Sequence, residues 1–501
     1  MNSSQYLKKG IFRKSLHLLK TKYMKCLILS VIFSCTVFNL FSQDSKPPKL
    51  VVGIVVDQMC YEYLYRYKSR YGEGGINRLM DEGANCRSTL YNYVPTYTGP
   101  GHASIYTGTT PDNHGIVGND WYDKTTRKEV NCVEDLSVQT IGAVSEEGKC
   151  APTRLKALTI TDQLKMTYPS AKVISVSIKN RGAILPGGHL SDGSYWFDYT
   201  SGDFITSTFY QNSLPAWVSN FNKQDYPQNF LKQTWNTLYD IKTYTASGPD
   251  DSPYEHLLKG KTTPTFPYDL KAMTNDVPNF DLFTSTPFAN TYLTDFALGA
   301  LRNEALGKDD QTDFLAISYS TPDIIGHSFG PQSIEIEDTY LRLDQDLERL
   351  FKALDAQVGK DNYVLFLTAD HAVVPVPQYF IDNNLPGGYL YLDEPLKKLN
   401  EKLVQKYGDT LILEQTNLNI YLDNDLIAKK QLDKEEIMEF IKADVSTWKG
   451  VKRAYTSTEL LQSGAGDVWT EKMKHGYHPS ESGDVLFMSE AGYLPKHVES
   501  K

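Results

Sequence analysis

The chain has 501 residues, of which 41 % are hydrophobic and 12 % aromatic, and its formal net charge is −10. This length suits a large α/β enzyme with insertions better than one small domain. The 33 tyrosines and 21 phenylalanines can fill a large core, which argues against a disordered chain. The acidic balance, without a basic stripe in the sequence, argues against a nucleic-acid partner.

Residues 1–45 are predicted to be a signal-peptide region, which leaves residues 46–501 as the catalytic domain. A basic stretch precedes the apolar run Cys26–Phe41, which is shorter than the roughly 20 residues that a spanning helix needs. We therefore expect an exported protein, periplasmic, cell-surface or secreted, with no membrane span after signal removal. Met24 is an alternative start, and lipidation of Cys35 is a weaker alternative.

Four cysteines remain after the signal region: Cys60, Cys86, Cys132 and Cys150. An even number of cysteines in an oxidising compartment favours disulfides. Cys132 and Cys150 bracket a loop, which would leave Cys60 with Cys86, but all three pairings stay open. A zinc–thiolate site is less favoured because the sequence has no C-x-x-C pair.

Strand and helix patterns alternate along the chain. Short apolar, β-branched runs predict strands that are buried on both faces of a parallel sheet. Apolar residues at helical spacing predict the helices between them. The alternation predicts an α/β fold with a mostly parallel central sheet. The strands are expected at 50–56, 172–178, 314–319 and 363–367, and helices at 76–82 and 334–357.

Two stretches depart from this alternation. Residues 183–290 are aromatic, polar and interrupted by proline and glycine, and they predict a cap insertion over the site. Residues 389–455 alternate helix and strand patterns and predict a smaller inserted α+β lobe. Both are expected to be insertions within the single catalytic domain.

Each predicted strand is followed by polar residues of catalytic type. In open α/β sheets, ligands bind outside the carboxyl ends of the strands, so these side chains are expected to converge. They are Asp57, Lys179 with Arg181, Asp323, and Asp370 with His371.

Thr98 precedes Gly99-Pro100-Gly101 and a run with helix-like spacing. Proline is tolerated in the first turn of a helix, so Thr98 is predicted at or just before a helix N-terminus. Free N–H groups and the positive end of the helix dipole favour an anion there, and the hydroxyl could attack a phosphate. The structural alternative is a simple N-cap threonine.

The remaining candidates are metal ligands. Asp323 and His327 are one helical turn apart, and His478 stands in a distant Tyr-His-Pro-Ser turn. With the carboxylates and imidazole at the strand ends, they form a mixed N/O set that suits Zn²⁺ better than Mg²⁺ or Ca²⁺. Singly, each has a structural alternative: a helix cap for Asp57, a surface pair for Asp323 with His327, and a buried ion pair for Asp370 with His371.

Together these motifs resemble the alkaline phosphatase superfamily, and most of all its monomeric flavobacterial-type members with a threonine nucleophile. The resemblance covers about residues 48–490, with the motifs in the family's order. It rests on Asp57, Thr98 to His102, Thr110 to Asn119, Lys179-Asn180-Arg181, Thr321 to His327, Ala369-Asp370-His371 and His478.

The resemblance implies a three-layer sandwich and a monomeric phosphatase with two Zn²⁺ ions. One zinc would be held by Asp323, His327 and His478. The other would be held by Asp57, Thr98, Asp370 and His371. Asn119, Lys179 and Arg181 match the positions that contact phosphate. Two departures are Ala372, where glycine is common, and Asn180, where an acidic residue is common.

The predicted function is hydrolysis of small phosphate monoesters through a phosphothreonine on Thr98. Asn119, Lys179 and Arg181 would stabilise the charged oxygens. One alternative is a phosphodiesterase or nucleotide pyrophosphatase of the same superfamily, which should lack the Lys-x-Arg pair. A sulfatase would need Cys or Ser at position 98. A non-catalytic metal-binding secreted protein should have lost a ligand.

Overall fold

The computed structural model describes residues 46–274, 280–462, 464 and 466–496. The chain divides into two units, Met1–Pro48 and Lys49–Lys501, and every helix and strand among the described residues lies in the second unit. The predicted signal region lies outside the described residues. Within the described ranges, no helix is both long enough and apolar enough to cross a membrane.

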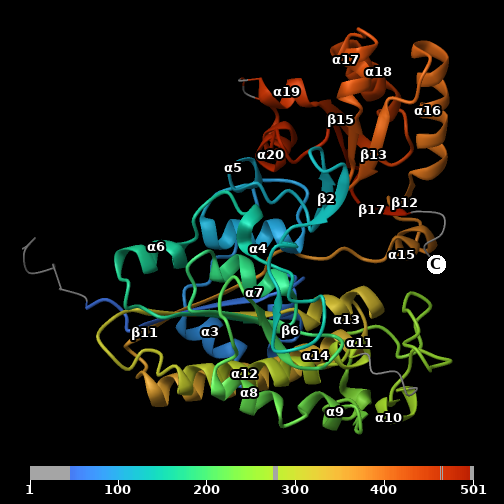
Figure 1. Ribbon diagram of the computed structural model, residues 1–501. Coiled ribbons are helices and arrows are strands. Elements are labelled where there is room, and N and C mark those ends of the chain that lie inside the picture. Colours follow the sequence, from blue (N-terminus) through green and yellow to red (C-terminus); the bar gives the residue numbers. More distant parts are fainter. Residues whose placement is uncertain (1–45, 275–279, 463, 465, 497–501) are drawn as a thin grey trace, which may run out of the picture. The chain divides into compact units, whose positions relative to one another are not determined.

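A seven-stranded sheet forms the centre of the second unit (Figure 1). Its order is β11-β1-β10-β5-β6-β7-β4; the first five strands are parallel, and the β6–β7 and β7–β4 pairs are antiparallel. Val55 of β1 lies beside Ser318 of β10 and Thr368 of β11, so these strands end at the same edge. The strands are β1 Leu50–Val56, β4 Thr140–Ile141, β5 Val173–Ser177, β6 Gly193–Phe197, β7 Phe204–Ser207, β10 Asp313–Tyr319 and β11 Tyr363–Thr368.

Helices cover both faces of this sheet, which confirms the predicted three-layer α/β fold (Figure 1). Successive side chains of a strand point to opposite faces. Ile54 of β1 therefore joins the large core under α12 and α14, whereas Val55 packs with Tyr106 of α4 on the other face. The helices around the sheet are α2 Tyr63–Arg66, α3 Ile76–Glu82, α4 Thr98–Thr107, α5 Pro111–His114, α6 Ile160–Thr167, α7 Asn180–Gly187, α8 Ala216–Asn222, α12 Phe288–Asn303, α13 Thr321–Phe329 and α14 Ile334–Gln357.

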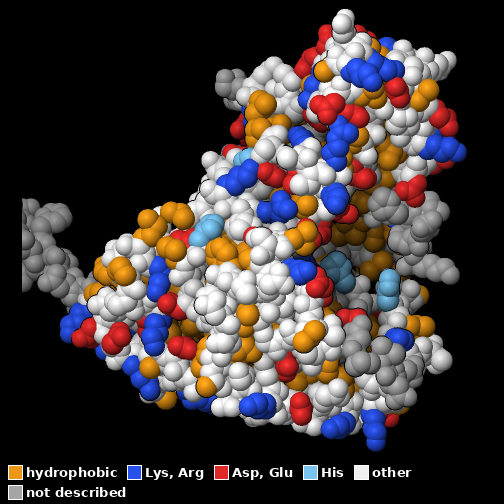
Figure 2. Space-filling view, in the orientation of Figure 1, with side chains coloured by type: hydrophobic (Ala, Val, Ile, Leu, Met, Phe, Trp, Pro, Cys, Tyr) orange, Lys and Arg blue, Asp and Glu red, His pale blue; other side chains and the backbone are white. Residues whose placement is uncertain are grey.

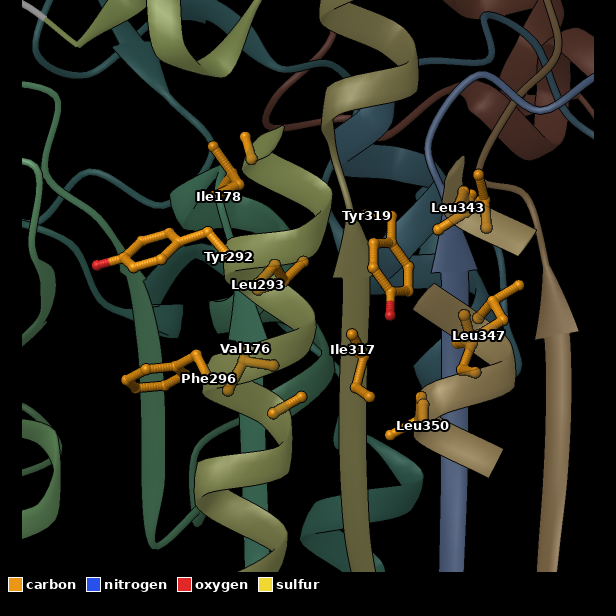
Figure 3. Close-up of a cluster of buried hydrophobic side chains, with 14 of the residues drawn as sticks. Val176, Ile178, Tyr292, Leu293, Phe296, Ile317, Tyr319, Leu343, Leu347 and Leu350 are labelled. Carbon is orange, nitrogen blue, oxygen red and sulfur yellow. The ribbon is translucent and has the colours of Figure 1, made fainter. Parts of the chain in front are cut away.

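The core under the sheet is built from the apolar faces of α12 and α14 (Figure 3). Leu293 of α12 and Leu347 of α14 lie against Val176 and Ile317 of the sheet, and all four are buried. Ser333 caps α14: its hydroxyl accepts a hydrogen bond from the Ile336 N–H at 3.2 Å, a contact that typically contributes about 1 kcal/mol. The core thus holds in place the sheet at whose strand ends the candidate site lies.

The segment 183–290 differs in part from the cap that its composition predicts. Its first part supplies β6 and β7 to the central sheet, because the run 193–197 is fully buried despite its glycine, serine and aromatic composition. Only the part after β7 leaves the sheet. That part contains α8, α9 Tyr226–Phe230, the β8 Thr234–Trp235 and β9 Tyr268–Asp269 pair, α10 Leu270–Met273 and α11 Asp281–Thr284.

The predicted lobe, residues 389–455, has a four-stranded sheet and a hydrophobic core of its own. The sheet order is β13-β14-β16-β15, so the lobe also includes β16, beyond residue 455. The remaining elements are β2 Asp120–Asp123, β3 Lys128–Asn131, α15 Pro377–Asp382, β12 Gly388–Tyr391, α16 Asp393–Tyr407, β13 Ile412–Thr416, β14 Asn419–Leu422, α17 Asn424–Lys429, α18 Lys434–Val445, β15 Val451–Thr456, α19 Ser457–Leu461, α20 Val468–Gly476, β16 Val485–Ser489 and β17 Tyr493–Lys496.

Charged side chains of both signs are interspersed over the face of the molecule that Figure 2 shows. The chain carries 51 basic and 61 acidic residues, and on this face they alternate instead of forming one basic surface in the part that the structure describes.

Glu335, in the first turn of α14, is a buried carboxyl group that favours its protonated form. Its Oε1 accepts a hydrogen bond from the Tyr268 hydroxyl at 2.6 Å, and its Oε2 has no hydrogen-bond partner among the described residues. Burial raises the pKa of Glu335 to about 8. A group whose pKa rises on folding contributes stability below its unfolded pKa, about 4.3 for glutamate, and loses it as the pH rises through the folded pKa.

We expect the free energy of unfolding to fall between pH 6 and pH 9, and Glu335→Gln to make this fall smaller because the variant no longer titrates. Urea unfolding of both proteins at the two pH values measures this. Glu401→Gln, at an exposed position, is the control and should follow the wild type. The same pH dependence in both variants would contradict the prediction.

Candidate active site

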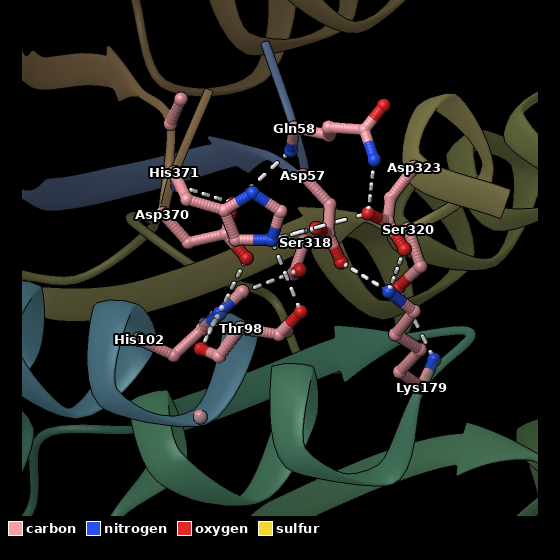
Figure 4. Close-up of polar contacts among 12 residues, drawn as sticks. Asp57, Gln58, Thr98, His102, Lys179, Ser318, Ser320, Asp323, Asp370 and His371 are labelled. Carbon is pink, nitrogen blue, oxygen red and sulfur yellow. Dashed lines mark hydrogen bonds and ion pairs between the residues drawn. The ribbon is translucent and has the colours of Figure 1, made fainter. Parts of the chain in front are cut away.

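Four neighbouring strands of the central sheet lead into polar residues at one edge (Figure 4). Asp57 directly follows β1, Lys179 comes shortly after β5, Asp323 lies in the first turn of α13 after β10, and Asp370 follows β11. Because these strands are adjacent and parallel, their carboxyl ends meet at the edge where open α/β sheets bind ligands. The fold therefore brings together side chains that are far apart in the sequence.

Asp57, Asp323 and His371 form a group whose ligand atoms all lie within 4.8 Å of one another. The His371 Nε2 atom is 3.3 Å from Asp57 Oδ1 and 3.9 Å from Asp323 Oδ1. Asp57 is fully buried, and its Oδ1 has the His371 ring as an ion-pair partner but accepts no hydrogen bond from the described residues, so a cation could take the place of the ring proton there. Carboxylate and imidazole are ligands that divalent metals such as zinc accept. This Asp and His cluster therefore fits a metal ion.

Asp370 and His371 carry opposite charges. Burial raises the pKa of Asp370, but the positive ring of His371 and the hydrogen bond with His102 outweigh this effect and bring it to about 2. Burial lowers the pKa of His371, but the Asp370 and Asp57 carboxylates outweigh it and bring the pKa to about 10. In the protein without a metal ion, the His371 ring is therefore protonated at neutral pH. A metal ion that binds Nε2 must displace the proton on that nitrogen.

The Lys179 ammonium lies between two of the carboxylates. Its Nζ donates to Asp57 Oδ2 at 2.7 Å and to Asp323 Oδ2 at 2.5 Å, and its backbone N–H donates to Ser320 Oγ at 3.2 Å. Burial lowers the pKa of Lys179, but Asp57 and Asp323 outweigh it, so the pKa is raised. The lysine thus stays charged, and its charge is fixed beside the candidate metal ligands.

Thr98 is the first residue of α4, so its hydroxyl lies at a helix N-terminus. Its Oγ1 is 3.4 Å from His371 Nε2. The N-cap position belongs to Tyr97 and no side chain caps the helix, so the Thr98 hydroxyl does not act as an N-cap. The Gly99 and Gly101 N–H groups already have acceptors, so it is the positive dipole end of α4 that favours an anion at this position.

Asn119 is held against the start of the same helix. The Gly99 N–H donates to Asn119 Oδ1 at 2.7 Å. A Cβ at Gly99 would lie 2.9 Å from the Gly118 carbonyl oxygen and 3.2 Å from Cys132 Sγ, so a glycine is needed for this close approach. Because its oxygen is occupied, Asn119 can present its amide NH₂ group as a donor.

Arg181, in α7, has a side-chain hydrogen-bond donor that no described residue accepts. Its backbone N–H donates to Asn180 Oδ1 at 2.7 Å, while its guanidinium Nε is buried and donates to none of the described residues. Arg181 lies close enough to Lys179 for their charges to repel. Two cations therefore lie near each other, an arrangement that favours an anionic ligand.

The two other predicted metal ligands are placed differently. His327 Nε2 is 3.2 Å from Asp323 Oδ1, one turn along α13, and its side chain is 74 % exposed. His478 lies after α20, where its Nδ1 accepts a hydrogen bond from the Ser480 N–H at 3.3 Å and its pKa is lowered by burial and by Lys156. The contacts within the described ranges join His327 to the cluster and do not join His478 to it.

His102 is a site residue to which sequence reasoning gave no role of its own. Its Nδ1 is 2.9 Å from the Thr98 carbonyl oxygen and 3.3 Å from Asp370 Oδ2, and its Nε2 is 2.8 Å from Ser318 Oγ. The buried ring thus contacts both the start of α4 and the residues that follow β11. Its position one helical turn after Thr98 is the signal that could have revealed it.

The predicted disulfides are absent among the described cysteines, which are all free thiols. The Cys60 thiol is held by Val373, whose N–H and carbonyl oxygen both lie 3.4 Å from Sγ. Cys86 is exposed, and Cys150 Sγ accepts a hydrogen bond from Asn180 Nδ2 at 3.4 Å. The Cys60 and Cys150 thiols thus contact other groups, a situation that an even cysteine count cannot reveal.

Comparisons with known proteins identify relatives along nearly the whole chain. The type I phosphodiesterase / nucleotide pyrophosphatase family matches residues 51–501. Alkaline phosphatase PhoV from Synechococcus elongatus is 44 % identical over 485 residues, 94 % of this chain and 87 % of PhoV. Alkaline phosphatase PafA from Elizabethkingia meningoseptica is 42 % identical over 450 residues, 89 % of this chain and 82 % of PafA.

Solved structures agree with these relatives. The crystal structure of wild-type PafA superposes with a TM-score of 0.85 at 41 % identity and covers 90 % of this chain and 86 % of PafA. A PafA variant with one threonine, one asparagine, one lysine and one arginine substituted gives a TM-score of 0.86 at 40 % identity, over 90 % of this chain and 87 % of that one. This chain therefore belongs to the type I phosphodiesterase / nucleotide pyrophosphatase family, with the alkaline phosphatases PhoV and PafA among its relatives.

Proposed function

We propose that this protein is an alkaline phosphatase that hydrolyses phosphate monoesters through a phosphothreonine on Thr98. The observation that carries the proposal is the position of the Thr98 hydroxyl, at the N-terminus of α4 and 3.4 Å from His371 Nε2, beside the Asp and His cluster. A nucleophile, a metal-type ligand set and an anion-favouring helix end meet at one point. The names of PhoV and PafA support the same activity.

Two zinc ions are the proposed cofactors. Asp323, His327 and His478 would hold one of them. The other would be held by Asp57, Thr98, Asp370 and His371. When bound, the ions would supply Lewis-acid charge that lowers the pKa of the hydroxyl and offsets negative charge on phosphate. His478 stays a prediction, because among the described residues its hydrogen bonds join it to neighbours such as Ser480 and Ser482 and not to the cluster.

The reaction proceeds in two displacements. In the first, Thr98 Oγ1 forms a bond to phosphorus while the P–O bond to the leaving alcohol breaks, and the alcohol takes up a proton. In the second, water attacks the phosphothreonine, releases inorganic phosphate and restores the hydroxyl. The positive end of the α4 dipole favours the negative oxygens in both steps.

Asn119, Lys179 and Arg181 are proposed to hold the phosphate oxygens. Lys179 and Arg181 supply two adjacent positive charges, and the unpaired Nε of Arg181 is a ready donor. The PafA variant is substituted at the same four residue types, with the same spacing from threonine to asparagine and from lysine to arginine as in this chain. The match in type and spacing supports roles for all four residues.

Export to the periplasm, cell surface or medium, and a monomeric state, are part of the same proposal. The signal region that predicts export lies outside the described residues. Export would give the enzyme access to phosphate esters outside the cytoplasm.

A comparison of three esters tests the proposal. We expect purified protein to hydrolyse p-nitrophenyl phosphate faster than bis(p-nitrophenyl) phosphate, and p-nitrophenyl sulfate least. Chelation should abolish activity, and Zn²⁺ should restore it better than Mg²⁺. Faster turnover of the diester would identify a phosphodiesterase instead. Bound metal without turnover of any ester would identify a non-catalytic metal-binding protein.

A further inference from the structure

Gln58 has a backbone conformation that few residues other than glycine adopt. It directly follows Asp57, its φ angle is +65°, and it is only 5 % exposed. A non-glycine residue in the left-handed region is uncommon, and such residues cluster at functional sites where the surroundings hold them in place. The conformation therefore calls for a local explanation.

The contacts of Gln58 reach two further carboxylates of the site (Figure 4). Its backbone N–H donates to Asp370 Oδ1 at 3.1 Å, and its side-chain Nε2 donates to Asp323 Oδ1 at 2.7 Å. The left-handed turn allows the backbone and the side chain of one residue to reach different carboxylates. Gln58 thus connects the ends of β1 and β11 with the first turn of α13.

The side-chain amide has little freedom to turn away. A Cβ at Gly326 would collide with Gln58 Oε1, so the glycine of α13 provides the space that the amide fills. Turning the amide over would direct its oxygen at the Asp323 carboxylate, where two acceptors would repel. The NH₂ group is therefore fixed on Asp323.

We propose that Gln58 is a positioning residue for the metal site: its amide orients Asp323, and its backbone N–H orients Asp370. The inference rests on the proposed function, because Asp323 and Asp370 are assigned there to different zinc ions. Hydrogen bonds that orient a ligating carboxylate typically change metal affinity by about 10–100-fold when they are removed. Because Asp323 is the one carboxylate among the described residues that accepts a hydrogen bond from the amide, loss of the amide acts on one of the two ions.

Zinc binding by the full chain, measured by competition with a chelating dye, tests this without relying on activity. Gln58→Met keeps the length of the side chain and removes the donor. We expect one of the two zinc ions to bind about 10–100-fold more weakly and the other to be retained. Gln58→Gly, which accepts the left-handed backbone and keeps the N–H bond to Asp370, should show the same selective loss and guards against misfolding of the first variant.

Two glutamines elsewhere serve as matched controls. Gln378 Nε2 donates to Asp382 Oδ1 at 2.7 Å on the surface, so Gln378→Met removes the same kind of contact away from the site. Gln357 Nε2 donates to the Leu301 carbonyl oxygen at 2.6 Å, so Gln357→Met should reduce thermal stability and leave zinc affinity unchanged.

The outcomes separate this inference from the proposed function. Wild-type affinity for both ions in both Gln58 variants overturns the role of Gln58 and leaves the proposed function standing. Loss of zinc by Gln357→Met to the same extent would also overturn it, because destabilisation alone would then explain the effect. A wild-type protein that binds no zinc overturns the two-zinc proposal and this inference together.

Discussion

Replacing Thr98 with alanine is expected to lower kcat/KM for a phosphate monoester by at least about 10³-fold, because the variant has no hydroxyl to accept the phosphoryl group. The helix N-terminus and the Asp and His cluster stay in place, since the one hydrogen-bond contact of Oγ1 with the described residues is with His371 Nε2, at 3.4 Å. Metal content should therefore remain largely intact. Acid quenching during turnover of ³²P-labelled substrate should trap phosphothreonine in the wild type and no labelled protein in the variant.

Two further variants make the result specific to Thr98. Thr96→Ala changes an exposed threonine two positions earlier and should keep full activity. Thr98→Ser retains a hydroxyl and should retain much of the phosphoenzyme. Full turnover by Thr98→Ala, or label trapped on another residue of the wild type, would show that the nucleophile lies elsewhere.

The Lys179→Ala, Arg181→Ala double variant is expected to lose monoesterase activity steeply and to keep most of any diesterase activity. A monoester is a dianion with three charge-sharing terminal oxygens, whereas a diester has two such oxygens and one charge. Arginine offers a planar fork for two oxygens, and lysine offers a point charge. Removing one preorganised donor typically costs about 2.7–4 kcal/mol at the transition state, which is roughly 10²–10³-fold in rate.

The single variants separate two causes of the lost monoesterase activity: a changed metal cluster and a lost phosphate contact. Lys179 also neutralises the Asp57 and Asp323 carboxylates, at 2.7 and 2.5 Å, so Lys179→Ala changes the metal cluster as well as phosphate binding. Arg181→Ala leaves those contacts intact and isolates the phosphate contact. The kcat/KM values of each variant for a monoester and a matched diester measure the two contributions. Arg127→Ala, which changes an exposed arginine paired with Asp425, is the control. Equal losses on both substrates would favour a phosphodiesterase.

The sequence determined the elements that have a strong local signal. The run 50–56 and the helix 334–357 have the predicted bounds, because a continuous β-branched run and a long apolar stripe at helical spacing depend only on neighbouring residues. Asp57 and Asp370 were placed at strand ends for the same reason. Convergence of the strand ends then followed from the parallel sheet, without knowledge of any contact.

Only the tertiary structure decided the features that depend on distant contacts. Strands β6 and β7 join the central sheet although their composition predicts a cap, because burial among the aromatic side chains of α12 outweighs local propensity. The four described cysteines are free thiols, and packing placed Val373 beside Cys60 and Asn180 beside Cys150. Gln58 and His102 became site residues through hydrogen bonds to Asp323, Asp370 and Thr98. Local sequence cannot encode such contacts, because each depends on where another strand ends.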